Sequence, residues 1–196
     1  MLLAMKYKVN EIFHSVQAEG ENAGRAAVFV RFAGCNLKCP FCDTNHEPFI
    51  EMTGEEINAE ITRLAPDRKT LVVFTGGEPL LQLSSEEVLA DGYPRAVETN
   101  GIFSLPSWWG ANDWCTVSPK CDLTSQQLSK ANEVKLLHGL TPNMVEACSA
   151  LPSEVWLYVQ PIERNGKFDV MDAINFIQKN PRWKLSVQWH KITGVR

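Results

Sequence analysis

Three closely spaced cysteines are the residues whose type and spacing most clearly predict chemistry in this chain. Cys35, Cys39 and Cys42 follow the spacing C-x3-C-x2-C. Thiolates this close together repel one another unless a cation holds them, so the spacing predicts a metal or cluster site. A [4Fe–4S] cluster usually takes four cysteine ligands. Three cysteines would therefore leave one iron open to a ligand that can react.

The same cysteines allow two other interpretations. His46 follows Cys42 by four residues and would complete a Cys3His zinc tetrahedron. A disulfide framework is less favoured, because such frameworks belong to short secreted chains. The apolar run at residues 1–5 is too short for a signal peptide. We therefore expect the reducing cytoplasm as the compartment.

Length and composition limit the class of protein. The chain has 196 residues, is 44% apolar and 21% charged, and carries a net charge of −4. We expect one globular domain over residues 1–196. The charge argues against binding of nucleic-acid phosphates, and no segment is long and apolar enough to span a membrane. Cys115, Cys121 and Cys148 have apolar surroundings in the sequence, so we expect them to pack in the core.

Apolar strands that end in polar clusters are the elements that must position these residues. Strands are predicted over residues 9–13, 26–32, 70–75, 95–98, 114–117, 132–136, 155–159 and 183–187, and helices over residues 53–65, 84–90, 141–150 and 169–179. The carboxyl ends of parallel strands share one face of an α/β fold. The expected fold is an incomplete, open TIM-like barrel of about six parallel strands with few helices. Its chemistry should gather at one rim.

Polar residues and glycines near these strand ends add to the cysteine site. Gln17 and Glu19 alternate in a polar loop, so in an extended segment both side chains leave the same side. Arg31 lies inside an apolar strand and needs either a salt-bridge partner or an anionic ligand. Gly76 and Gly77 follow a strand directly, where they let the backbone approach a ligand closely. A solvated loop, a structural ion pair and a plain turn are the ordinary alternatives.

The cysteine spacing resembles the signature of the radical S-adenosylmethionine (SAM) superfamily. Further segments, in order from near residue 10 to the C-terminus, resemble the 7-carboxy-7-deazaguanine synthase (QueE) family. These segments are Phe13–Gly20, Phe29–Phe32, Gly34–Leu37, Phe41–Thr44, Thr75–Pro79, Glu98–Gly101, Val117–Lys120, Val159–Pro161 and Gln188–Lys191. The family has an unusually short radical SAM fold, which suits 196 residues. Ala18 replaces the glycine usual in the family, and Trp189 replaces a smaller residue.

The resemblance implies a radical SAM lyase. Cys35, Cys39 and Cys42 would hold a [4Fe–4S] cluster whose fourth iron chelates SAM. One electron would cleave SAM to methionine and a 5′-deoxyadenosyl radical, which takes a hydrogen atom from 6-carboxy-5,6,7,8-tetrahydropterin. The ring contracts with loss of ammonia to give 7-carboxy-7-deazaguanine, a precursor of queuosine and other deazapurines, and SAM is regenerated. The family also implies Mg2+, a flavodoxin or ferredoxin as electron donor, and a homodimer.

The resemblance also assigns site residues position by position. The cofactor-binding residues it implies are Phe41, Cys42, Asp43, Gly77, Glu98, Ser118, Pro119, Lys120, Gln160, Pro161, Ile162 and Glu163. The substrate-binding residues it implies are Val16, Gln17, Ala18, Glu19, Arg31, Thr75, His190 and Arg196. Among these, Arg31 would pair with the substrate carboxylate. Thr44 matches the Mg2+ position, and this ion accepts few protein oxygens and keeps water or substrate oxygens.

Two rival functions remain open from the sequence. Another small radical SAM enzyme, such as a glycyl-radical activase, would need the cysteines and the paired glycines but not Gln17, Arg31 or Thr44. A zinc-stabilised binding module would need only the cysteines and His46.

Overall fold

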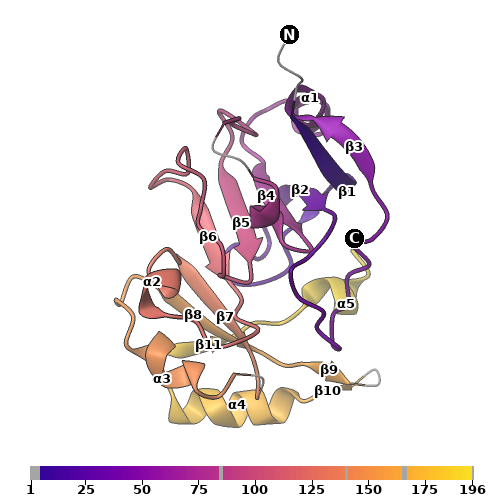
Figure 1. Ribbon diagram of the computed structural model, residues 1–196. Helices are drawn as coiled ribbons and strands as arrows, with labels where there is room; N and C mark the ends of the chain where they lie inside the picture. The colour runs from indigo at the N-terminus through magenta and orange to yellow at the C-terminus, as the bar shows by residue number, and fades with distance from the viewer. Residues whose placement is uncertain (1–4, 84–85, 140, 165–166, 196) are drawn as a thin grey trace.

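A nine-stranded sheet forms the body of the molecule (Figure 1). The computed structural model describes residues 5–83, 86–139, 141–164 and 167–195. The strand order in the sheet is β11-β8-β7-β6-β5-β4-β2-β1-β3. The strands are β1 (Lys6–Val16), β2 (Ala26–Phe32), β3 (Ile50–Thr53), β4 (Leu71–Gly76), β5 (Arg95–Thr99), β6 (Trp114–Val117), β7 (Glu133–Leu137), β8 (Trp156–Gln160) and β11 (Trp183–Leu185).

The seven strands from β2 to β11 run parallel, and β1 and β3 add an antiparallel edge. The order of the sheet starts at β11 and ends at β3, so the sheet is not closed. The predicted open, partial barrel is therefore confirmed, with one parallel strand more than expected. The second, two-stranded sheet pairs β9 (Glu163–Arg164) with β10 (Lys167–Phe168), and the sequence did not predict it.

The parallel strands are buried on both faces, as continuous apolar runs require. Val28, Val30 and Phe32 of β2 belong to the large core beneath the helices, whereas Ala27 and Phe29 belong to a smaller cluster on the opposite face. The rings of Phe13 and Phe29 stack within that smaller cluster, with centroids 5.1 Å apart. This face of the sheet carries the cavity described below.

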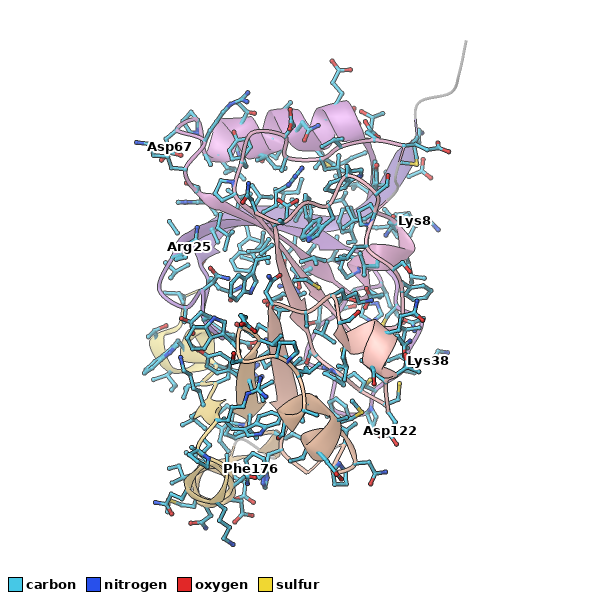
Figure 2. The ribbon with its side chains drawn as sticks, turned by 90° about the vertical axis from the view of Figure 1, so that its left-hand side faces the viewer. Lys8, Arg25, Lys38, Asp67, Asp122 and Phe176 are labelled. Atoms are coloured by element: carbon cyan, nitrogen blue, oxygen red, sulfur yellow. The ribbon has the colours of Figure 1, made fainter. Side chains whose placement is uncertain are left out.

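Helices are few and mostly short. They are α1 (Gly54–Leu64), the 3-10 turn η1 (Pro79–Leu81), α2 (Ser125–Leu128), α3 (Met144–Ser149), α4 (Val170–Lys179) and α5 (Trp189–Thr193). Thr53 starts α1 through a reciprocal capping box with Glu56. Asp67, just after α1, and Phe176 of α4 lie at opposite ends of the molecule (Figure 2). Among the described residues, no helix has the length and apolar character needed to cross a bilayer.

The helix predicted over residues 84–90 is wrong for its described part. Residues 86–90 form no helix, and the two serines before them lie outside the described residues. Leu89 is fully buried, and Ala90 takes a positive φ of 54°, which a right-handed helix does not allow. The Ala90 amide donates to the Asn58 side chain at 2.7 Å. Contacts with the rest of the fold therefore override the local helical pattern.

Other sequence expectations need smaller corrections. The polar connector after the cysteines contains strand β3, which pairs with β1. The last strand ends at Leu185, and helix α5 follows it. Cys115 and Cys148 are buried as expected, but Cys121 is exposed, so the prediction for that cysteine was wrong. Cys121 follows the end of β6 by four residues and lies in a surface loop.

Candidate active site

A cavity of about 680 Å³ opens at the carboxyl ends of the parallel strands. The cysteine loop, the loop after β1, the ends of the central strands and helix α5 all contribute to its wall. Strand register explains how residues far apart in sequence share this wall. Arg31 is paired with Thr75, and Lys135 with Tyr158, along a continuous ladder of parallel strands. Because side chains alternate between faces, every second residue of each strand faces the cavity side.

The cysteine loop contributes all three of its thiols to this wall. Cys35, Cys39 and Cys42 line the cavity. The Leu37 amide donates to the Cys35 sulfur at 3.4 Å, and the Cys42 amide donates to the Cys39 carbonyl at 3.1 Å. Burial raises the pKa of Cys35 and of Cys39, and the neighbouring thiols raise both further. A cationic cluster would relieve this repulsion, so the donor set fits an iron–sulfur cluster.

The alternative zinc ligand, His46, lies at the base of the same loop. Its backbone carbonyl accepts a hydrogen bond from Gly34 at 3.1 Å. Its Nδ1 atom is buried without a hydrogen-bond partner among the described residues. Within the described ranges, no three or more His, Cys, Asp or Glu side chains already converge on a metal position.

The paired glycines bring the end of β4 against the cysteine loop. A Cβ atom on Gly77 would lie 1.9 Å from the Gly34 carbonyl oxygen, and one on Gly76 would lie 2.1 Å from the Phe32 carbonyl oxygen. Gly76 also has a φ of +129°, which disfavours any other residue. The Gly77 amide donates to Phe32 and the Glu78 amide to Gly34, at 3.1 and 2.9 Å. Only glycine permits this approach.

Glu78, which follows these glycines, is a buried structural carboxylate. It accepts hydrogen bonds from the Thr99 hydroxyl and the Asn100 amide, both at 2.7 Å, and from the Leu80 amide at 3.1 Å. Burial nevertheless raises its pKa. The carboxylate ties the turn after β4 to the end of β5, and so holds two strand ends at the cavity in register.

Polar side chains gather on the wall that faces the loop after β1. Glu98 accepts from the Gln17 amide at 3.0 Å and from the Thr75 hydroxyl at 2.8 Å. Glu19 is ion-paired with Lys135 and accepts from the Gln188 amide at 2.8 Å. Both carboxylates line the cavity. Glu98, which was expected near SAM, lies here beside residues expected to meet the pterin.

Arg31 has a protein partner as well as a place on the cavity wall. Its Nε lies 2.9 Å from a carboxylate oxygen of Glu11 on the neighbouring strand β1. The side chains of Arg31 and Glu11 are 22% and 28% exposed, and Arg31 lines the cavity. The structural ion pair and the anion-binding role are therefore compatible, because the other guanidinium nitrogens can still donate to a ligand.

The C-terminal segment connects both sides of the cavity. Lys191 on α5 lies 2.8 Å from the carboxylate of Asp43, the residue after the third cysteine. Burial disfavours the charge of Asp43, but Lys191 and Gln188 hold the pKa of its carboxyl below its ordinary value. The Trp189 amide donates to the Ala18 carbonyl at 3.2 Å. Helix α5 is thereby attached to the cysteine loop and, through its N-terminal end, to the loop after β1.

The structure brings most of the predicted site residues together. The predicted residues that line the cavity are Val16, Gln17, Ala18, Glu19, Arg31, Cys35, Cys39, Phe41, Cys42, Asp43, Thr44, Thr75, Gly77, Glu98, Ser118, Lys120, Gln160, Pro161, Ile162 and His190. Pro119 is buried but is not part of the wall. Glu163 belongs to β9, and its side chain is not described. Arg196 lies outside the described residues.

Sequence reasoning missed several residues of the wall. Lys135, Asn100, Gln188 and Lys191 line the cavity but were assigned no role. Lys135 carried the same signal as Arg31, a charge inside an apolar strand, and could have been found by it. Lys120 is one of the residues expected to contact SAM. Burial lowers the pKa of its ammonium to about 8, and the nearby positive charge of Lys135 acts in the same direction.

Comparisons with known proteins agree with this arrangement. Residues 29–104 match the Radical SAM superfamily. The chain is 38% identical to the 7-carboxy-7-deazaguanine synthase of Bacteroides thetaiotaomicron, over 98% of this chain and 100% of that protein. It is 32% identical to the synthase of Haemophilus influenzae, over 96% and 94% of the two chains. The crystal structure of QueE from Escherichia coli superposes with a TM-score of 0.72 at 26% identity, covering 94% of both chains. Because these similarities span the cavity and every element that builds it, the chain belongs to the 7-carboxy-7-deazaguanine synthase family of the radical SAM superfamily.

Proposed function

We propose that this chain converts 6-carboxy-5,6,7,8-tetrahydropterin to 7-carboxy-7-deazaguanine with loss of ammonia, as a radical SAM lyase. The observation that carries the proposal is one shared cavity for the cysteine loop and for Gln17, Glu19 and Arg31. A zinc module or an unrelated radical SAM activase has no need for this combination. When bound, the [4Fe–4S] cluster and SAM supply the radical chemistry. The protein binds and orients both molecules and keeps water away.

The cysteine side of the cavity is suited to the cluster and SAM. Cys35, Cys39 and Cys42 are the proposed cluster ligands. Around them lie the proposed SAM contacts: Phe41, Asp43, Gly77, Ser118, Lys120, Gln160, Pro161 and Ile162 on the wall, with Pro119 and Glu163 next to it in the chain. The Gly77 amide already donates to the Phe32 carbonyl, so we assign the Gly77 backbone carbonyl to the contact with SAM. A backbone carbonyl suits the amino group of SAM.

The opposite side is suited to the pterin. Arg31 offers a guanidinium to the substrate carboxylate, which it can bind with charge-assisted hydrogen bonds. Val16, Gln17, Ala18 and Glu19 present backbone and side-chain groups to the ring, and Thr75 and His190 complete the wall. We assign Arg196 to the same side from the family alone. Thr44 lies next to Asp43 on the wall, so an oxygen set for Mg2+ is available together with the substrate carboxylate.

The remaining assignments are proposals of the same kind. Residues 1–196 act as one radical SAM domain. A flavodoxin or a ferredoxin supplies the electron, and two copies of the chain form a homodimer, as the family implies. A reducing cytoplasm suits a protein with a cysteine cluster site and an exposed free cysteine, Cys121.

Anaerobic reconstitution followed by product analysis tests the function. The protein is loaded with iron and sulfide, reduced with dithionite, and incubated with SAM and 6-carboxy-5,6,7,8-tetrahydropterin. Mass spectrometry should show 7-carboxy-7-deazaguanine, with many turnovers for each SAM. Cys39→Ala should remove the roughly four irons per chain and all turnover, whereas Cys121→Ser, on the exposed cysteine, should retain both. A colourless protein containing zinc, or 5′-deoxyadenosine without any deazapurine, contradicts the proposal.

A further inference from the structure

A buried lysine faces the cavity from the middle of an apolar strand. Lys135 lies on β7 between Val134 and Leu136, and it is only 6% exposed. Its ammonium is ion-paired with Glu19, which comes from the loop after β1 and whose side chain is 14% exposed. Both side chains line the cavity. Burying two charges costs desolvation free energy, so such a pair is weak evidence for a purely stabilising role.

Other contacts already attach the loop after β1 to the sheet. The Glu21 amide donates to the Glu133 carboxylate at 2.8 Å, and the Tyr158 hydroxyl donates to the Glu21 carboxylate at 2.6 Å. The Trp189 amide donates a hydrogen bond to the Ala18 carbonyl. Glu133 is on the same strand and the same face as Lys135 but does not line the cavity. Glu21, Glu133 and Tyr158 do not line the cavity, so their contacts anchor the loop away from the ligand space. The pair of Lys135 and Glu19 is therefore not needed to attach the loop.

The pair fixes the charge and the direction of the Glu19 carboxylate. One carboxylate oxygen accepts from the Lys135 ammonium, and the other accepts from the Gln188 amide at 2.8 Å. Burial disfavours the charge of Glu19, but Lys135 holds the pKa of the carboxyl below its ordinary value. A carboxylate has about four lone-pair sites, so two hydrogen bonds leave it able to accept from a ligand.

The other charges in the cavity have different tasks. Glu98 accepts from two neutral donors, Gln17 and Thr75, and among the described residues no Lys or Arg side chain donates a hydrogen bond to it. Arg31 is paired with Glu11 and lies on strand β2, away from β7 in the sheet. Asp43 also lines the cavity and is ion-paired, but with Lys191 and next to the cysteines. Among the described residues of the loop after β1, Glu19 is the cavity carboxylate that a direct cation contact keeps ionised.

We propose that Lys135 is a positioning residue for selectivity at the pterin ring, an inference that rests on the proposed function. It holds Glu19 as an oriented anion, and this anion accepts the two N–H groups that a 2-amino-4-oxo pyrimidine presents side by side, the 2-amino N–H and N3–H. A 2-oxo ring places an acceptor against the same carboxylate. A buried acceptor that meets another acceptor leaves both unpaired, so the 2-oxo ring is rejected.

A pair of unreactive fluorescent ligands tests this role. 6-Carboxypterin and 6-carboxylumazine differ in the 2-amino and 2-oxo groups, and their binding to the reconstituted protein with SAM can be followed by fluorescence titration without turnover. The wild-type protein should prefer the pterin on the order of 100-fold or more, and Lys135→Met should reduce this preference to about tenfold or less. Glu133→Gln is the matched control, because Glu133 is also buried on β7 and contacts the loop. It should keep the wild-type preference.

A second variant covers the case in which an unpaired Glu19 destabilises the protein. Glu19→Gln with Lys135→Met removes both charges, which is tolerated better than the removal of one, and it should also lose the preference. If either variant keeps the wild-type preference, the inference is wrong, while turnover by the wild-type protein still stands. If the wild-type protein binds 6-carboxypterin no better than 6-carboxylumazine but makes the deazapurine, again only the inference fails. Absence of both binding and turnover overturns the proposed function as well.

Discussion

Charged residues inside apolar strands mark the ligand space of this protein. Arg31 on β2 and Lys135 on β7 are each flanked by buried apolar residues, and each has a carboxylate partner from another element. Their partners, Glu11 and Glu19, both come from β1 or the loop after it. Burying such a side chain costs free energy unless its charge is paired or binds a ligand. At the scale of single residues, a charged side chain inside an apolar strand is therefore the signal that indicates the ligand site.

Arg31→Ala should weaken pterin binding without affecting SAM cleavage. Loss of a charge-assisted contact to the substrate carboxylate should raise the Kd for 6-carboxypterin by about 10- to 100-fold. Reductive cleavage of SAM in the absence of the pterin should stay close to the wild-type rate, because we assign Arg31 to the substrate carboxylate and not to SAM. Binding is measured by fluorescence titration and cleavage by chromatography of 5′-deoxyadenosine.

Arg25→Ala is the matched control for Arg31. The Arg25 guanidinium donates to the Asn22 side chain at 2.6 Å, and Arg25 lies on the side of the molecule away from Lys38 of the cysteine loop (Figure 2). This variant should bind 6-carboxypterin like the wild-type protein. An equal loss of pterin binding and SAM cleavage in Arg31→Ala would count against the carboxylate role.

Between elements, close backbone contacts decide the shape of the cysteine side. Strand β4 ends against the cysteine loop, and a side chain at Gly77 would overlap the Gly34 carbonyl. Gly77→Ala should therefore push the two elements apart and cost on the order of 1–3 kcal/mol of folding free energy. The iron and sulfide content after reconstitution should fall well below the wild-type value.

The control for this substitution is Gly110→Ala. The nearest atom to a Cβ at that position is the Asp113 carboxylate oxygen at 3.8 Å, an ordinary contact, and the position needs no positive φ. Iron content and thermal midpoint should match those of the wild-type protein. If Gly77→Ala also loads a full cluster at unchanged stability, the close approach has no role in forming the site.

Helix α5 is the element that ties the C-terminal segment to the cysteine loop. Lys191→Met removes the ion pair with Asp43. The side chains of Lys191 and Asp43 are 21% and 53% exposed. We expect amide hydrogen exchange in Trp189–Thr193 to become faster and the Kd for SAM to rise by about two- to tenfold, as for a partly exposed ion pair.

Lys184→Met provides the comparison for this variant. Lys184 also forms an ion pair, with Glu21 at 3.3 Å, and packs over Trp156, but it does not line the cavity. The Lys184→Met variant should leave amide hydrogen exchange in α5 and the affinity for SAM unchanged. Unchanged exchange in Lys191→Met would mean that other contacts suffice to hold α5.

For the whole molecule, a buried carboxyl group on β7 links stability to pH through its protonation. Glu133 is 2% exposed, and burial raises its pKa from 4.5 to about 7. In this range the folded protein keeps a proton that the unfolded chain releases. The stability contributed by protonated Glu133 is thus fully present below about pH 4.5 and is lost as the pH rises to about 7.

Glu133→Gln should remove this dependence, because the amide stays neutral at every pH. The free energy of unfolding of the variant, relative to the wild-type protein, should rise between pH 4.5 and 7 by an amount on the order of 3 kcal/mol and then level off. Urea unfolding of both proteins at half-unit pH steps measures the difference. Parallel profiles would show that Glu133 ionises in the folded protein as it does in the unfolded chain.

Local patterns in the sequence determined much of this protein. The boundaries of β2 and β6 match the prediction, because continuous apolar runs between polar clusters allow one register. The cysteine spacing and the paired glycines identified the chemistry, because both depend on neighbours in the chain. The family resemblance named twenty residues that line the cavity wall.

Only the tertiary structure decided which distant groups meet. Lys135 and Glu19 are 116 residues apart, and no local pattern pairs them. Residues 86–90 follow a helical pattern but are held in a bent, non-helical conformation by contacts with α1 and the core. Strand β3 forms because the exposed edge of β1 offers it hydrogen bonds. Pairing across a sheet and burial against a neighbour depend on the position of other elements, and that information is spread over the whole chain.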